Sequence, residues 1–124
     1  CQGMVQRTFG NPLYAAVELA TTADPQMTRT ATGLLRAWAQ YPEAIYVIGN
    51  APTALQTLCD CMVADARQPP LVIAVPVGFV GVVEAKQRVA ALSVPQIRVA
   101  GRKGGSPVAA AILNALLVLA WEAA

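Results

Sequence analysis

The segment from Leu71 to Val77, LVIAVPV, is an unbroken apolar run with prolines before it and a glycine after it. Such a run is typical of a β-strand that is covered on both faces, as strands are in parallel sheets packed between helices. Pro76 has no N–H group to donate, so we expect the ladder of hydrogen bonds to end there. The run therefore predicts a central strand of an α/β domain.

Other short apolar runs alternate with longer segments of helical period, which indicates a mainly parallel sheet. The predicted strands are Leu13–Leu19, Ile45–Ile48, Leu71–Val77 and Ile97–Ala100. The predicted helices are Pro25–Gln40 after an N-cap at Asp24, Pro52–Ala66, Gly81–Leu92 and Ser106–Trp121. The connections are short, so we expect residues 1–124 to form a single domain.

The composition excludes some classes of partner and favours others. Hydrophobic residues make up 56% of the chain and charged residues 13%, whereas globular averages are roughly 45–50% and about 25%. We therefore expect part of the surface to be buried against another chain. The net charge of +2 is small and scattered, so nucleic acid is not an expected partner.

The cysteines and the longest apolar segment bear on location and metal binding. Cys1, Cys59 and Cys61 occur without any histidine, which makes a poor zinc set, and we interpret them as reduced thiols of a cytoplasmic protein. The apolar run Val108–Trp121 is interrupted by Asn114 and is shorter than the about 20 residues that a membrane span needs. It is therefore predicted to be a buried helix, and no membrane contact is expected.

Ligands of parallel α/β sheets bind beyond the carboxyl ends of the strands. Three predicted turns meet at that edge: Gly49–Thr53 (GNAPT), Pro76–Gly81 (PVGFVG) and Gly101–Ser106 (GRKGGS). In the first, Gly49 can adopt backbone angles that other residues avoid, and Pro52 suits the first position of a helix. This turn exposes a helix N-terminus that favours an anion. A strand-to-helix turn without any ligand is the alternative.

The GRKGGS turn has the residues of an anion-binding loop. Gly104 and Gly105 allow the backbone to form an anion-accepting nest, and Ser106 can cap the last helix. Arg102 and Lys103 add positive charge, which suits a carboxylate or a phosphate. The glycine spacing matches neither a dinucleotide fingerprint nor a P-loop. A solvated basic turn is the alternative.

The PVGFVG turn places Phe79 between two glycines, where its ring could cover a flat ligand or anchor the loop. Glu84 and Lys86 on the following helix are predicted to be surface charges. The sequence contains no Ser-His-Asp set, no carboxylate pair at a telling spacing and no metal-binding cluster. The residues by themselves therefore predict an α/β domain that binds an anionic, flat ligand.

Three segments resemble the precorrin-8X methylmutase family of cobalamin biosynthesis in order and spacing. They are IGNAPTAL from Ile48, PVGFVGVVEAK from Pro76 and GRKGGSPVAAAILNAL from Gly101. Upstream, CQGMV from Cys1 and TRTATGLLRAW from Thr28 show a weaker likeness. The resemblance covers essentially the whole chain, and three separate loop motifs in order are highly specific.

The resemblance implies a Rossmann-like three-layer α/β domain in a homodimer, with active sites near the subunit interface. It implies a tetrapyrrole substrate with several acetate and propionate groups. The family's reaction moves a methyl group from C-11 to C-12 of precorrin-8X to give hydrogenobyrinate, or acts on the cobalt-containing counterpart. This rearrangement is promoted by protonation of the substrate and is expected to need no cofactor.

The matching motifs also suggest which residues contact the substrate. These candidates are Arg29, Thr30, Asn50, Ala51, Thr53, Gly78, Phe79, Arg102, Gly104, Gly105 and Ser106. The family assigns the protonation to a histidine upstream of the matched region, and this sequence contains none. We therefore name no catalytic residue, and we expect the chain to be a partial domain that continues before Cys1.

Two other functions are compatible with the sequence. One is a non-catalytic corrinoid-binding module that kept the substrate-binding loops without the acid. The other is an unrelated α/β domain that binds a small phosphate, which would require three matched loops to be a coincidence. The sequence does not distinguish a cobalt-containing substrate from a metal-free one.

Overall fold

The computed structural model describes residues 14–15, 29–78 and 80–123, and within them a parallel sheet of three strands. The strands are β1 (Tyr46–Ile48), β2 (Val72–Ala74) and β3 (Gln96–Arg98), in the spatial order β1-β2-β3. In register, Ile73 of the central strand lies opposite Val47 and Ile97. The predicted parallel α/β sheet is confirmed.

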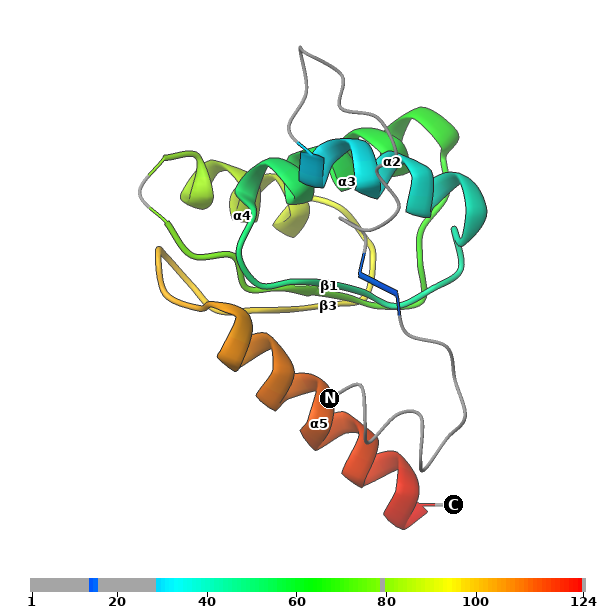
Figure 1. The fold of residues 1–124 in the computed structure, drawn as a ribbon, viewed down its shortest axis with the longest axis vertical. Helices are drawn as coiled ribbons and strands as arrows, with labels where there is room; N and C mark the ends of the chain where they lie inside the picture. Colours follow the sequence, from blue (N-terminus) through cyan, green and yellow to red (C-terminus); the bar gives the residue numbers. More distant parts are fainter. Residues whose placement is uncertain (1–13, 16–28, 79, 124) are drawn as a thin grey trace.

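Helices cover both faces of this sheet. The described helices are α2 (Arg29–Gln40), α3 (Pro52–Asp65), α4 (Val82–Ala90) and α5 (Ser106–Ala123). Figure 1 shows α2, α3 and α4 side by side on one face and α5 on the other, so the three-layer arrangement is also confirmed.

Two predicted segments near the start of the chain cannot be compared in full. The predicted strand Leu13–Leu19 lies outside the described residues except for Tyr14 and Ala15, which form no regular element. The predicted helix start at Asp24 and Pro25 also lies outside them, while the rest of that helix is found as α2.

The central strand is buried on both faces, as its apolar run predicted. Val72 and Ala74 pack into the core beneath α2, α3 and α4, whereas Ile73 and Val75 face α5. The strand is nevertheless shorter than the predicted Leu71–Val77. The Val75 N–H group still donates to the carbonyl oxygen of Ile48 at 2.9 Å, but Pro76 has no N–H to continue the ladder.

The larger part of the core lies between the sheet and α2, α3 and α4. Its most enclosed side chains include Leu55 and Leu58 of α3 and Val89 of α4, which are fully inaccessible to solvent. The thiols of Cys59 and Cys61 are also buried there and unpaired. Burial raises the pKa of both thiols, so they are poor nucleophiles and act as core residues.

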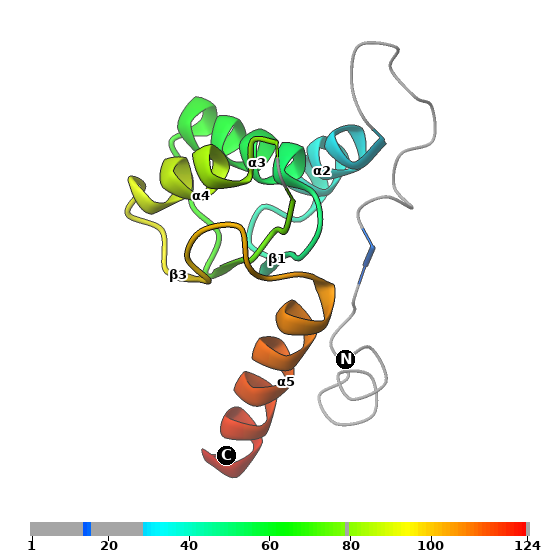
Figure 2. The ribbon, with the colours of Figure 1, turned by 90° about the vertical axis from the view of Figure 1, so that its left-hand side faces the viewer.

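Helix α5 departs from its prediction, because it is a helix but is largely exposed within this chain. Ala109 alone among its described residues is buried, and exposure rises to 62% at Leu119 and 60% at Trp121. Figure 2 shows the reason: only the first turns lie against the sheet, and the axis then diverges from the domain. The expected buried helix is therefore wrong for the described chain.

The length and composition of α5 would also allow it to cross a membrane. Core helices of soluble proteins, which are mostly buried, pass the same test.

Candidate functional site

The loops that follow the three strands are in contact with one another at the carboxyl edge of the sheet. They lie together on the left of Figure 1 and face the viewer in Figure 2. A Cβ atom on Gly49 would lie 2.8 Å from Cα of Ser106, and one on Gly78 would lie 4.0 Å from Cγ of Pro52. The Gly105 N–H group donates to the carbonyl oxygen of Val75 at 2.9 Å. The three loops therefore lie together at this edge, as the sequence predicted.

The first loop presents the N-terminus of α3 without a side-chain cap. Ala51 is the N-cap residue and is extended (φ −116°, ψ 98°), as expected for a residue before proline. The N–H groups of Ala54 and Leu55 donate to the Ala51 carbonyl at 3.0 and 3.3 Å. The Thr53 amide lies in the first turn of α3 and has no acceptor among the described residues, so it is available to an anion.

The third loop uses its glycine pair to lie against the end of β2. Gly104 has φ +142°, and a Cβ atom there would lie 2.2 Å from the carbonyl oxygen of Val75. Only glycine fits such an approach of two backbones. The Gly105 amide is satisfied by the same carbonyl oxygen, so it is not free for a ligand. Within the described residues the amides of Arg102, Gly104, Ser106 and Val108 have no acceptor.

Lys86 is buried, so its prediction as a surface charge is wrong. Only 4% of the residue is exposed, whereas Glu84 is exposed as predicted. The Lys86 Nζ atom donates to the carbonyl oxygens of Gly101 at 2.7 Å and Lys103 at 2.6 Å. A sequence signal for this existed, since the spacing of Val82, Lys86 and Val89 places the lysine in the apolar stripe of α4.

The exposed cations of the third loop carry no acidic partner within the described residues. Arg102 and Lys103 are both exposed. The two ion pairs found in the described chain lie elsewhere: Arg67 with Glu43 at 2.9 Å, and Arg88 with Asp60 at 2.5 Å. We call the carboxyl edge of the sheet, with its three loops, the loop edge. Among the described residues it combines unpaired positive charge with unpaired backbone N–H groups, and both attract carboxylates or phosphates.

Most of the remaining predicted site residues lie near this edge. Asn50 is exposed beside Ala51, and Ser106 begins α5 against Gly49. Arg29 and Thr30 form the first turn of α2, which packs beside α3, with Arg29 exposed. Phe79 lies outside the described residues. The structure thus brings together the described loop candidates, while Arg29 and Thr30 lie on α2, which packs against α3.

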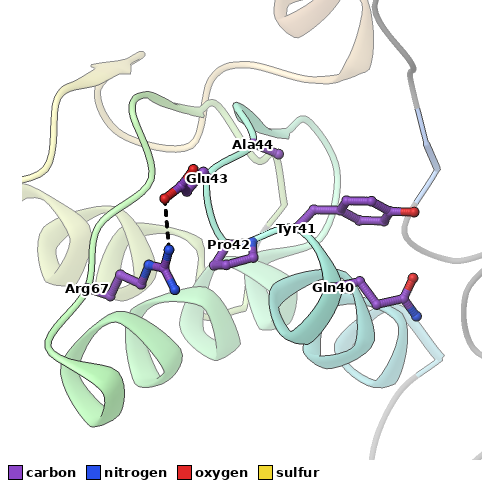
Figure 3. Close-up of a pocket in the computed structure, with 6 residues that line it drawn as sticks. All are labelled: Gln40, Tyr41, Pro42, Glu43, Ala44 and Arg67. Atoms are coloured by element: carbon purple, nitrogen blue, oxygen red, sulfur yellow. Dashed lines mark hydrogen bonds and ion pairs between the residues drawn. The ribbon is translucent and has the colours of Figure 1, made fainter.

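A surface cavity lies at the opposite edge of the sheet. Its volume is about 470 Å³, and it is lined by Gln40, Tyr41, Pro42, Glu43, Ala44 and Arg67 (Figure 3). These residues precede β1 and β2, so the cavity is at the amino ends of the strands. The Arg67–Glu43 pair, with a 2.9 Å contact, neutralises the charges of this cavity.

The described residues hold no group of three or more acidic, cysteine or histidine side chains that could bind a metal ion. The described residues at the carboxyl edge of the sheet offer amides, glycines and cations. This set of groups suits an anionic ligand.

Comparison with known proteins agrees with the motifs. The profile of the precorrin-8X methylmutase (CbiC) family matches residues 2–119. A cobalt-precorrin-8 methylmutase of Synechocystis sp. is 65% identical over 121 residues, which cover 98% of this chain and 56% of the relative. A precorrin-8X methylmutase of Pseudomonas aeruginosa is 49% identical over 92 residues, covering 72% of this chain and 44% of that protein.

A solved structure gives the same result at the level of the fold. Precorrin-8X methyl mutase from Thermus thermophilus superposes with a TM-score of 0.85 at 36% identity, covering 95% of this chain and 59% of that chain. The chain spans about half the length of the curated relatives it matches. The matched fold, the loop motifs and the profile agree, and the chain belongs to the precorrin-8X methylmutase family.

Proposed function

We propose that this chain forms the substrate-binding part of a precorrin-8X methylmutase. Such an isomerase moves a methyl group from C-11 to C-12 of precorrin-8X, or of cobalt-precorrin-8, in cobalamin biosynthesis. The observation that carries the proposal is the meeting of three sequence-distant loops at one sheet edge, with open amides at Thr53 and Gly104 and an exposed cation at Arg102.

The chemistry of the substrate fits this edge. A tetrapyrrole with acetate and propionate groups presents several carboxylates around a flat ring. The N-termini of α3 and α5 both begin at the loop edge, and each favours a negative charge through its amides and its dipole. Arg102 would add a charge-assisted hydrogen bond to one carboxylate.

In this proposal the loops bind and orient the macrocycle, and protonation is assigned to no residue of this chain. The candidate contacts are Asn50, Ala51, Thr53, Gly78, Phe79, Arg102, Gly104 and Ser106, with Arg29 and Thr30 from α2. Gly105 belongs to the site through its support of the loop, because its amide already serves Val75.

We also propose that the protein works as a cytoplasmic homodimer. The exposed apolar side chains of α5, which include Leu119 and Trp121, support a partner surface on this helix. Light scattering of the purified chain would test this, and a monomer at micromolar concentration would contradict it.

Activity is best tested in a graft, in which this chain replaces the matched 121-residue segment of the Synechocystis relative. The 65% identity makes the two segments compatible. The assay follows the absorbance change as precorrin-8X or cobalt-precorrin-8 rearranges. We expect turnover, and a folded graft without turnover would refute the proposal of a methylmutase. Tight binding of hydrogenobyrinate without turnover would instead favour a corrinoid-binding module.

A further inference from the structure

Lys86 is a buried cation without a carboxylate partner among the described residues. Lysine is almost never fully buried unless it is paired, yet this residue is 4% exposed. Its two described acceptors are both carbonyl oxygens of the GRKGGS loop, Gly101 at 2.7 Å and Lys103 at 2.6 Å. The whole of its described hydrogen bonding is therefore directed at one loop.

The burial of this ammonium carries a cost. Desolvation lowers the pKa of Lys86, which means that the fold disfavours its charge. An apolar side chain of similar length would avoid that cost and would fill the same stripe of α4 beside Val82 and Val89. Core packing therefore does not explain why a lysine stands here.

Peptide geometry shows what the two hydrogen bonds do to the loop. In a trans peptide the C=O group and the following N–H group point in opposite directions, and the described chain has no cis peptide. The Gly101 and Lys103 carbonyls point to Lys86, so the amides of Arg102 and Gly104 point away from it. These are two of the amides that have no acceptor in the described chain.

We propose that Lys86 is a positioning residue, which holds the Gly101 and Lys103 carbonyls inward so that the Arg102 and Gly104 amides face the substrate carboxylates. The inference rests on the proposed function for the identity of the ligand. Lys86 is 4% exposed and its described hydrogen bonds go to the loop, so in this proposal it acts through the loop and not by contact with the substrate.

The test compares Lys86→Met, which keeps the apolar stem, with Lys86→Arg, which keeps the charge. A cavity of about 200 Å³ beside Lys86, lined in part by Val83, Arg98 and Gly101, leaves room for the larger group. Gln87→Met is the matched control, since Gln87 is the exposed neighbour on the same helix.

Hydrogen exchange measures the loop directly. Without the ammonium we expect the Gly105 amide, which donates to Val75, to exchange about tenfold faster or more, as lost charge-assisted bonds would allow. The Val75 amide, which donates to Ile48, should keep its rate. Unchanged exchange at Gly105 in Lys86→Met would overturn the inference. Lys86→Gln, which is uncharged, replaces Lys86→Met if that variant does not fold.

Kinetics of the graft measure the consequence for substrate. Because the loop binds substrate and transition state alike, Lys86→Met should raise KM about tenfold and leave kcat unchanged. Lys86→Arg should restore most of KM, and Gln87→Met should change neither constant. Faster exchange at Gly105 with an unchanged KM would also overturn the inference. A graft that is inactive with Lys86 intact counts against the proposed function, and the exchange experiment still decides whether Lys86 holds the loop.

Discussion

Replacing Gly49 by alanine tests the contact on which the loop cluster depends. A Cβ atom at this position would lie 2.8 Å from Cα and 3.1 Å from N of Ser106, and 3.2 Å from Cβ of Ala109. Gly49 has no positive φ, so its backbone angles suit alanine. Any loss of stability therefore reports the steric contact between the first loop and the start of α5.

The expected magnitude follows from which atoms would clash. The first two are backbone atoms of a helix terminus, which cannot rotate away, so the cost belongs in the upper part of the roughly 1–3 kcal/mol range for overpacking. Loss of glycine freedom in the unfolded chain returns about 0.4–1 kcal/mol. We expect a net loss of about 2 kcal/mol, or about 8 °C in Tm for a chain of this size.

Urea unfolding of the chain, followed by circular dichroism, gives the free energy of unfolding. Gly101→Ala is the control: it has φ +71° but nothing within 4 Å of a new Cβ, so it carries about 1–2 kcal/mol of backbone strain and no clash. Gly49→Ala should also disturb the Ser106 and Ala109 amide signals in an NMR spectrum. If Gly49→Ala is as stable as the parent chain, the proposed packing of the loops is wrong.

Three further substitutions test the fold and the α5 surface. Gly104→Ala should cost at least about 3 kcal/mol, because it combines an unfavourable φ with a clash at the Val75 carbonyl; stability equal to that of Gly101→Ala would contradict this. Burial raises the pKa of Tyr46 to about 12 from 10.0, so the unfolded state loses its proton first, and stability should fall as pH rises from 10 to 12. Tyr46→Phe should remove this fall in the free energy of unfolding between pH 10 and 12, as measured by urea unfolding at each pH. An unchanged pH dependence would assign the fall to other groups. Leu119→Glu should shift the chain from dimer to monomer in light scattering, whereas an intact dimer would place the interface elsewhere.

Much of the fold could be predicted because local signals and burial agreed. The strand around Ile73 follows from its apolar, mostly β-branched side chains, which suit a strand covered on both faces. The start of α3 follows from Pro52, because proline suits the first turn of a helix. The end of β2 before Pro76 was predicted for the same reason. Such local rules do not depend on the rest of the chain.

The errors arose where distant contacts decide. Gly49 was interpreted through its freedom of φ, yet its role in the structure is the close approach of Ser106. Lys86 was predicted from its charge alone, although its helical phase indicated burial. The apolar composition of α5 predicted a buried helix, but a helix is buried only where another surface meets it, and beyond Leu116 the sheet no longer does so.

The site itself could be predicted in outline, because parallel strands place their carboxyl ends together. The sequence could not predict which backbone amides lack an acceptor, because the acceptors lie far away in the sequence. Gly105 donates to Val75, whereas Gly104 does not, and no property of the GRKGGS segment distinguishes the two.

The most direct test of the substrate-binding edge is the affinity of the graft for hydrogenobyrinate, measured by calorimetry for two arginine variants. Arg102→Ala removes one of the two exposed cations of the third loop, and Arg67→Ala removes the cation of the cavity at the opposite edge. We predict that Arg102→Ala weakens binding by about 1.5–3 kcal/mol, roughly 10- to 150-fold, as expected for a charge-assisted hydrogen bond, and that Arg67→Ala leaves it unchanged. Unchanged affinity in Arg102→Ala, or a loss confined to Arg67→Ala, would contradict the account.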